Sequence, residues 1–175
     1  MGIALGDKGP EFSLLGVDGK TYSLSGLKEA RLVVVVFSCN HCPYVQAYEG
    51  RLIAVQRDYA AKGVQLVAIN ANDAAKYPDD SFPEMVKRAK AKGYNFPYLH
   101  DVTQQVARAY GAERTPHIFV LDQSRVLRYT GRIDDNWQDA KAVKSHDLRD
   151  ALDALLAGKP VATQTPAIGC TVKWA

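Results

Sequence analysis

The stretch from Arg31 to Ser38, RLVVVVFS, constrains the fold more than any other part of the sequence. Its apolar residues are consecutive rather than alternating, which is typical of a strand covered on both faces. The next segment repeats apolar residues at helical spacing: Val45, Tyr48, Leu52, Val55 and Tyr59. Gly63 can end that helix, and the buried run VQLVAIN follows it. Strand, helix and strand in this order predict a parallel crossover.

The flanking sequence predicts more strands and helices around this unit. PEFSLLGVDGKTYSL alternates apolar and polar residues on both sides of Asp18-Gly19, which predicts a β-hairpin. Pro83 and Gly93 can begin and end a helix, and a short helix is expected from about Val102 to Tyr110. HIFVLD and LRYTGRI predict a strand, a turn and a strand, so the sheet should close with an antiparallel pair.

A well-marked helix is expected near the C-terminus, in SHDLRDALDALLAGKP. Ser145 is a suitable N-cap, leucines line one face, and Gly158 with Pro160 can stop the helix. The predicted fold class is therefore α/β, with a mixed sheet between helices. We expect a single domain over residues 1–175, divided into an N-terminal hairpin extension (1–28), a core (29–132) and a C-terminal helix with a tail (133–175).

Charge and hydropathy exclude two classes of partner. The net charge of +3 comes from basic residues scattered among acidic ones, without the basic block or aromatic-basic pattern of a nucleic-acid groove. The longest apolar run, Leu32 to Phe37, is far shorter than the ~20 residues of a membrane span. The N-terminus lacks a basic leader followed by an apolar segment. We therefore expect a soluble cytoplasmic protein with neither nucleic acid nor membrane as partner.

Two of the three cysteines, Cys39 and Cys42, stand between the first buried strand and its helix. Three cysteines in a chain of this length cannot make a disulfide scaffold, and in a reducing compartment a close pair is more typical of catalysis or metal binding. A spacing of three residues brings both sulfurs onto one turn, close enough to form a disulfide. The pair is therefore the first candidate for the functional site.

Cys39 is the expected attacking thiol of this pair. It follows the strand directly, and the free amides and dipole of a helix start favour a thiolate there. Because proline is tolerated only in the first helical turn, Pro43 puts the expected helix start at about Asn40. Cys39 is then the exposed thiol, and Cys42, one turn inside the helix, is the resolving thiol that clears a mixed disulfide.

Other interpretations of the cysteines remain open. The pair can be two buried, inert thiols, or half of a zinc site. The zinc ligands would be Cys39, Cys42, Cys170 and one of His41, His100, His117 or His146. Cys170 lies in AIGCTVKW, a predicted late strand or ordered tail, where it is either a small buried hydrophobe or a third redox thiol that relays the disulfide.

Three pieces of the sequence together resemble the thioredoxin superfamily, and within it the peroxiredoxin-like redoxin proteins. They are GDKGPEFSLLGVDGKTYSLSGLK, CNHC and ERTPHIFVLD, and they cover about residues 5 to 132. The resemblance implies a thioredoxin-like fold and a thiol-disulfide oxidoreductase that acts on protein or small-molecule disulfides or thiols. It implies no metal and no organic cofactor, with electrons from an unidentified thiol donor. The alternatives are a thiol-dependent peroxidase and a non-catalytic metal-binding or interaction module.

The resemblance also implies roles for residues around the pair. Thr115-Pro116 matches a cis bond that lies against the active disulfide, where the backbone before the proline pairs with a substrate segment. His41 stands where oxidising members of the superfamily have histidine, so it is expected to raise the reduction potential from thioredoxin's ~−270 mV towards ~−200 mV. The alternative for His41 is an ordinary solvent-exposed residue.

The sequence departs from the family pattern in two places. Val33 occupies the position of thioredoxin's buried acid, six residues before the first cysteine, which puts fast general disulfide reduction in doubt. Peroxiredoxins carry a Pro-x-x-x-Thr-x-x-Cys signature, but counting back from Cys42 reaches Cys39 and Val35, and counting back from Cys39 reaches Val36 and Leu32. Neither cysteine therefore has the neighbours that activate a peroxide.

Two further polar features have no assigned role. Asp134, Asp135 and Asn136 follow the closing strand and are interpreted as solvated turn caps rather than as a metal or substrate site. His117, next to Pro116, either approaches the thiols or faces the opposite side of its strand.

Overall fold

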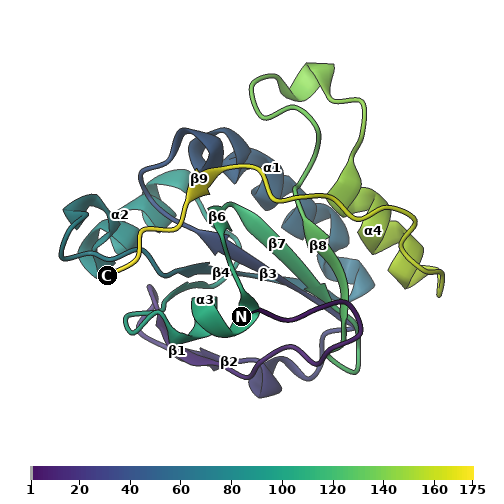
Figure 1. Cartoon of the computed structure of the whole chain (residues 1–175), viewed down its shortest axis with the longest axis horizontal. Helices are drawn as coiled ribbons and strands as arrows, with labels where there is room; N and C mark the ends of the chain where they lie inside the picture. The colour runs from purple at the N-terminus through teal and green to yellow at the C-terminus, as the bar shows by residue number, and fades with distance from the viewer. Residues whose placement is uncertain (1) are drawn as a thin grey trace.

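The centre of the fold is β3 (Leu32–Ser38), the run of valines, in a computed structural model that describes residues 2–175 (Figure 1). It pairs in parallel with β4 (Val64–Asn70) and antiparallel with β7 (His117–Leu121). The whole sheet has the order β2-β1-β5-β4-β3-β7-β8. The predicted α/β class, the parallel crossover and the antiparallel closing pair with β8 (Leu127–Gly131) are confirmed.

The N-terminal hairpin joins the other edge of this sheet. It consists of β1 (Ser13–Gly16) and β2 (Thr21–Ser23), as the alternation about Asp18-Gly19 predicts. β1 pairs antiparallel with β5 (Tyr98–His100), which in turn pairs in parallel with β4. Sequence reasoning missed β5, because three residues are too short to display a period.

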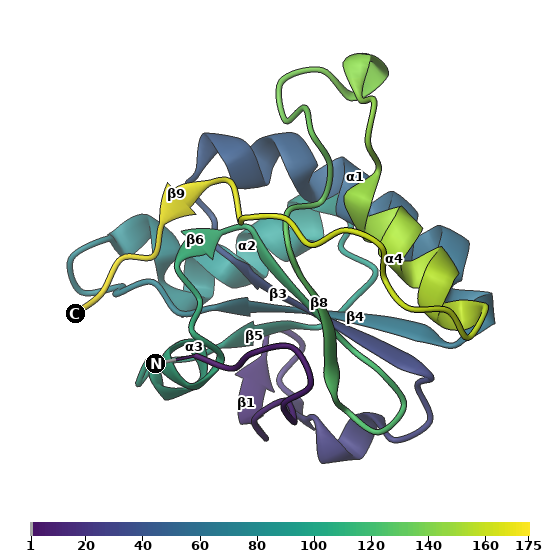
Figure 2. The same cartoon turned by 45° about the vertical axis from the view of Figure 1, so that its right-hand side comes forward.

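Helices cover both faces of the sheet, as Figures 1 and 2 show. On one face lie α1 (Pro43–Tyr59), α2 (Phe82–Lys92) and α4 (Asp147–Leu156), and on the other lies α3 (Gln105–Tyr110). Short 3-10 turns connect them: η1 (Ser25–Leu27), η2 (Ala60–Lys62), η3 (Pro78–Asp80) and η4 (Ala140–Ala142). Among residues 2–175, no helix combines the length and the apolar character needed to cross a bilayer.

The side chains of β3 alternate between two hydrophobic cores. Val34 and Val36 belong to the core beneath α1, α2 and α4, whereas Val33, Val35 and Phe37 belong to the one beneath α3. Every residue of β3 is buried. At ~1.5–3 kcal/mol for each large apolar side chain removed from water, this strand contributes much of the stability that holds its C-terminal end in place.

Two helix starts differ from the sequence expectation. α1 begins at Pro43 rather than at about Asn40, because Cys42 has an extended backbone (φ −150°, ψ 125°) and acts as the N-cap. α4 begins at Asp147 with His146 as N-cap; the hydroxyl of Ser145 instead donates to Asp147 Oδ1 at 2.8 Å. The predicted stops agree, since Gly63 and Gly93 have left-handed backbones at the ends of η2 and α2.

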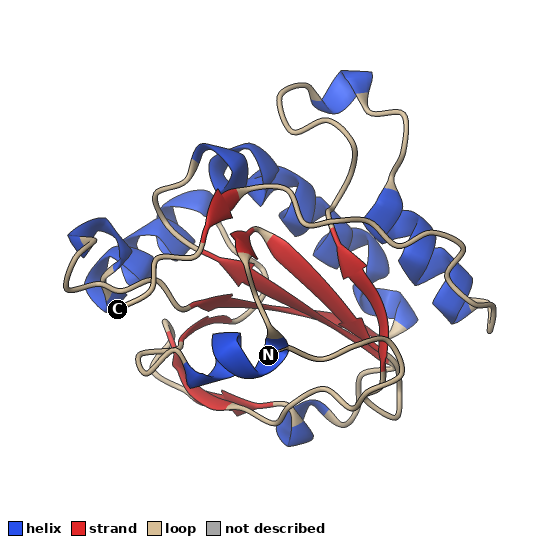
Figure 3. Cartoon of the chain, in the orientation of Figure 1, coloured by secondary structure: helices blue, strands red, loops and turns tan. Residues whose placement is uncertain are grey.

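After α4 the chain runs back over the sheet towards the start of α1. There β9 (Cys170–Thr171) pairs antiparallel with β6 (Arg114–Thr115), forming a second, two-stranded sheet next to the end of the main one (Figure 3). AIGCTVKW is thus both a late strand and an ordered tail. This course brings residues near the C-terminus beside residues that immediately precede β7.

Candidate active site

Cys39 and Cys42 meet at the C-terminal end of β3. Cys39 follows the last residue of the strand, and Cys42 caps α1. Both sulfurs lie against Thr115: Cys39 Sγ is 3.5 Å from its Oγ1, and Cys42 Sγ is 3.6 Å from its carbonyl oxygen. The Thr115-Pro116 bond is cis, as the resemblance implied. The structure therefore brings together the two thiols and the proline expected beside them.

Neither thiol is open to solvent. Each cysteine is only 1% exposed, and both form a small apolar cluster with Val45. The expectation that Cys39 is the exposed thiol is wrong. It depended on a helix beginning near Asn40, and the observed start three residues later leaves Cys39 in the loop, with Cys42 at the helix terminus.

The pKa values of the two thiols depend chiefly on the hydrogen bond between them. The pKa of Cys42 is lowered chiefly by the hydrogen bond from the Cys39 thiol, and the Cys170 thiol and the Val45 amide act in the same direction. Burial of the sulfur opposes this effect. The pKa of Cys39 is raised, because it donates to Cys42, is buried and faces the charge of Asp80. These directions are the opposite of the expectation that Cys39 is the more acidic thiol, and the Cys42 thiol also donates to the Thr115 carbonyl at 3.6 Å.

Asp80 is a member of this site that sequence reasoning missed. Its carboxylate is buried and accepts hydrogen bonds from the Asn40 amide at 2.6 Å and from Asn72 Nδ2 at 3.0 Å. The expected acid position, Val33, is an ordinary core residue. An acid from η3 therefore lies near the pair instead. Nothing in the polar loop NANDAAKYPDDSF distinguishes Asp80 from its exposed neighbour Asp79.

His41 projects away from the thiols. Its side chain is 74% exposed, and its Nδ1 lies 3.9 Å from Asp79 Oδ2. It lines a polar hollow of about 270 Å³ that also receives charged side chains of α2, among them Lys87 and Arg88. The loop between the two cysteines thus presents its polar side to solvent while both sulfurs stay covered.

His117 faces away from the pair. Its Nδ1 accepts a hydrogen bond from the Glu113 amide at 3.2 Å, and its Nε2 lies 3.2 Å from Thr130 Oγ1. The ring stacks on Phe119, and burial lowers its pKa to about 4. Both ring nitrogens are therefore engaged within the sheet.

Asp134 is a structural anchor rather than a solvated cap. It is buried and accepts hydrogen bonds from Arg51 Nη1 at 2.8 Å and from the Tyr48 hydroxyl at 2.7 Å. It thereby ties the segment after β8 to α1. Asp135 behaves as expected, because its exposed carboxylate accepts the Lys144 amide at 2.9 Å.

Cys170 completes a group that contains all three cysteines of the chain. Its side chain, half-buried, packs against Cys39, Cys42 and Val45. Burial and its hydrogen bond to Cys42 raise its pKa. Within residues 2–175, no group of three or more His, Cys, Asp or Glu side chains is arranged to hold a metal ion, so the zinc alternative lacks a ligand set there.

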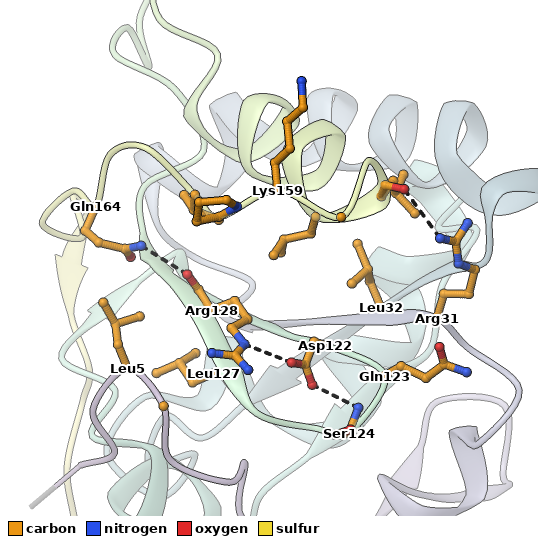
Figure 4. Close-up of a pocket in the computed structure, with 16 residues that line it drawn as sticks. Leu5, Arg31, Leu32, Asp122, Gln123, Ser124, Leu127, Arg128, Lys159 and Gln164 are labelled. Atoms are coloured by element: carbon orange, nitrogen blue, oxygen red, sulfur yellow. Dashed lines mark hydrogen bonds and ion pairs between the residues drawn. The ribbon is translucent and has the colours of Figure 1, made fainter.

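A larger cavity lies away from these thiols. About 540 Å³ in volume, it lies between the N-terminal end of β3, the turn into β8 and the residues that follow α4 (Figure 4). Its polar lining includes the ion pair of Arg128 Nε with Asp122 Oδ2, at 2.8 Å. β3 separates it from the cysteines at the strand's other end, so it is not part of this site.

Comparison with known proteins supports a redox interpretation of this geometry. The family model described as Redoxin matches residues 4–152. The thiol-disulfide oxidoreductase ResA of Geobacillus thermodenitrificans is 23% identical over 148 residues, which are 81% of this chain and 79% of the relative.

Two solved structures extend the comparison. An uncharacterized conserved protein from Geobacillus kaustophilus has a TM-score of 0.93 at 44% identity, covering 98% of this chain and 93% of that one. Peroxidoxin BcpB from Mycobacterium tuberculosis shares the fold, with a TM-score of 0.61 at 21% identity over 87% of this chain and 94% of its own. The first of these matches includes the C-terminal tail, which lies beyond the Redoxin match.

Proposed function

This chain belongs to the Redoxin family, and on that premise we propose that it is a thiol-disulfide oxidoreductase with Cys39 and Cys42 as its redox pair. One observation carries the proposal. Both sulfurs lie within 3.6 Å of Thr115, beside the cis bond to Pro116, and a hydrogen bond from the Cys39 thiol lowers the pKa of Cys42. Thioredoxin-fold relatives at low identity support the general class of chemistry.

Cys42 is the attacking thiol in this proposal, and Cys39 is the resolving one, the reverse of the assignment expected from sequence. The Cys42 thiolate attacks one sulfur of a substrate disulfide, forming a mixed disulfide and releasing one substrate thiolate. Cys39 then gives up its proton and attacks Cys42 Sγ, which releases the second substrate thiol. The products are a Cys39–Cys42 disulfide and two reduced substrate thiols. An external thiol donor returns the pair to its reduced state.

Three neighbouring residues tune this exchange. We assign substrate positioning to Thr115 and Pro116, because the backbone before the proline contacts the pair directly. We assign His41 to tuning of the potential: when its imidazole is protonated, a positive charge on the loop that joins the two cysteines favours the reduced form, so the couple is expected to be less reducing than thioredoxin's ~−270 mV. His41→Ala is then expected to lower the potential, as measured in glutathione buffers. The reaction as proposed needs no metal or organic cofactor and acts on protein or small-molecule disulfides in the cytoplasm.

Thiol peroxidase is the second candidate, and one observation favours it. Cys42 directly precedes Pro43 at the start of α1, and the thiol of Cys39 donates a hydrogen bond to Cys42 Sγ. Cys39 stands three residues before Cys42, which is where the peroxiredoxin signature has its threonine. In that reaction the Cys42 thiolate takes one oxygen from a peroxide and becomes a sulfenic acid, releasing hydroxide or alkoxide. The Cys39 thiol condenses with it, so water leaves and the same disulfide forms.

A single-turnover experiment tests the proposal and separates the two reactions. Reduced protein is mixed with oxidised glutathione or with hydrogen peroxide, and the disulfides are mapped by alkylation and mass spectrometry. We expect glutathione disulfide to yield Cys39–Cys42, and Cys42→Ser to slow oxidation by about 100-fold or more. An unchanged rate in Cys42→Ser refutes the assignment. A rate with peroxide that exceeds the rate with disulfide by a similar factor establishes the peroxidase instead.

A further inference from the structure

The chain's own tail pairs with the backbone that the proposed reaction needs for a substrate. In the β6–β9 ladder Thr115 stands opposite Cys170, and Arg114 stands opposite Thr171 (Figure 2). The Val172 amide extends the pairing by donating to the Glu113 carbonyl at 3.1 Å. An extended substrate cannot pair with this edge while β9 occupies it.

Gly169 allows the tail to lie directly on the residue that precedes the cis bond. A Cβ atom at Gly169 would lie 2.1 Å from the Thr115 carbonyl oxygen and 2.6 Å from its carbon. Both partners are backbone atoms, which cannot move aside as a flexible side chain can. The close approach of β9 to Thr115 therefore requires glycine at this position.

The tail is anchored on both sides of Cys170. Downstream, the Lys173 amide donates to Asn72 Oδ1 at 2.9 Å, and Gln104 Nε2 donates to the Lys173 carbonyl, also at 2.9 Å. Upstream, Thr165 Oγ1 accepts the Arg132 amide at 3.0 Å. These contacts hold the Cys170 side chain against the redox pair.

Burial distinguishes the three thiols. Cys39 and Cys42 are each 1% exposed, whereas Cys170 is only half-buried. Cys170 packs against the cluster that Cys39 and Cys42 form with Val45, and its thiol is close enough to Cys42 for the two pKa values to affect each other. An external disulfide therefore meets Cys170 first, and Cys42 is in contact with either possible partner for a disulfide.

We propose that Cys170 is a third catalytic thiol, which β9 presents to Cys42 in the manner of a bound substrate cysteine. The proposal rests on the function given above, with Cys42 still attacking and Cys39 still resolving. It adds that Cys42 attacks a mixed disulfide between Cys170 and the external molecule, rather than the external disulfide itself. The tail is then a built-in relay between the covered pair and disulfides in solution.

The electrons and protons of this relay balance. Cys170, as its thiolate, attacks an external disulfide, forms a mixed disulfide and releases one external thiolate. Cys42 attacks Cys170 Sγ and releases the second external thiolate, leaving a Cys42–Cys170 disulfide. Cys39 attacks Cys42 Sγ, so the pair becomes oxidised and Cys170 is regenerated. Two electrons leave the pair. Because Cys42 starts as a thiolate, the Cys39 proton and one proton from solvent end on the two external thiols, and Cys170 regains the proton that it lost before its attack.

Disulfide mapping in Cys39→Ser tests the relay, because this variant cannot complete the last step. Reduced protein is treated with oxidised glutathione, and the products are mapped by alkylation and mass spectrometry. We expect a Cys42–Cys170 disulfide to accumulate. Its absence, with Cys39–Cys42 still forming in the unsubstituted chain, overturns the relay alone. If neither disulfide forms, the proposed function fails as well, so the two failures are distinguishable.

A second measurement tests whether β9 covers the pair. Gly169→Ala is expected to displace β9 from Thr115 and to raise the rate of Cys42 alkylation by iodoacetamide by about tenfold or more. Gly50→Ala is the matched control, since a Cβ at Gly50 meets no atom within 4 Å. Equal alkylation rates in Gly169→Ala and Gly50→Ala, with both variants folded by circular dichroism, overturn the role of the tail.

Discussion

Removing the Cys39 thiol is the sharpest test of which cysteine carries the thiolate. The hydrogen bond from the Cys39 thiol is the largest cause of the lowered pKa of Cys42, and the Cys170 thiol and the Val45 amide act in the same direction. A hydrogen bond to a charged group contributes ~1.5–3 kcal/mol, which corresponds to ~1–2 pH units. Cys39→Ala is therefore expected to raise the pKa of Cys42 by about 1–2. Cys39→Ser keeps a donor in place, so it should raise that pKa less.

Ultraviolet thiolate absorbance measures these values, with the pH dependence of iodoacetamide alkylation as an independent readout. Both variants are compared in a Cys170→Ser background, so that the third thiol does not titrate. The reverse substitution, Cys42→Ala, leaves Cys39 beside Asp80 and buried, and we expect its pKa to stay above the ordinary value of ~8.5. If Cys39 ionises below that value in Cys42→Ala, or if Cys42 titrates identically in Cys39→Ala and Cys39→Ser, the assignment is refuted.

Three further predictions concern groups around the pair. Burial lowers the pKa of His117 to about 4, so as the pH falls this histidine is protonated in the unfolded chain before it is protonated in the folded one. The free energy of unfolding should therefore fall by up to about 3 kcal/mol from pH 6.5 to 4. Urea unfolding at several pH values checks this, and His117→Gln should reduce the dependence. Asp80→Asn removes the carboxylate charge near Cys39, so it should lower the pKa of that thiol. It should also cost ~1–3 kcal/mol of stability, because the carboxylate that accepts the Asn40 amide is lost. An unchanged titration of Cys39 would contradict this prediction. Glu49→Gln should cost about 2 kcal/mol, because it breaks the largely buried pair with Arg88 that joins α1 to α2; a urea midpoint equal to that of the unsubstituted chain would count against this.

Local pattern was sufficient for the scaffold around the site. Consecutive valines predicted β3, helical spacing predicted α1, and glycines marked the ends of η2 and α2. These signals work because backbone period and left-handed caps depend on residues that are neighbours in sequence. The threonine-proline step was found by resemblance, and the structure has it in cis.

The roles of the cysteines were not accessible in the same way. Moving the start of α1 by three residues exchanges the terminal position between Cys39 and Cys42, and helix boundaries are the least reliable part of a sequence prediction. Asp80 reaches the Asn40 amide from forty residues away. Its neighbour Asp79 has the same residue type but is exposed. Only burial separates a carboxylate that raises a thiol pKa from one that does not.

The sequence by itself therefore determined the α/β order of elements, the place of the cysteine pair between strand and helix, and the threonine-proline step. Tertiary structure decided that both sulfurs are buried against Thr115, which acid lies near them, and that Cys170 joins the group. The physical reason is distance along the chain: strand and helix periods are local, whereas a pKa or a contact between thiols depends on atoms that folding brings together from distant segments. β9, which follows β8 and α4 in the sequence, pairs with Thr115 of β6, which precedes both.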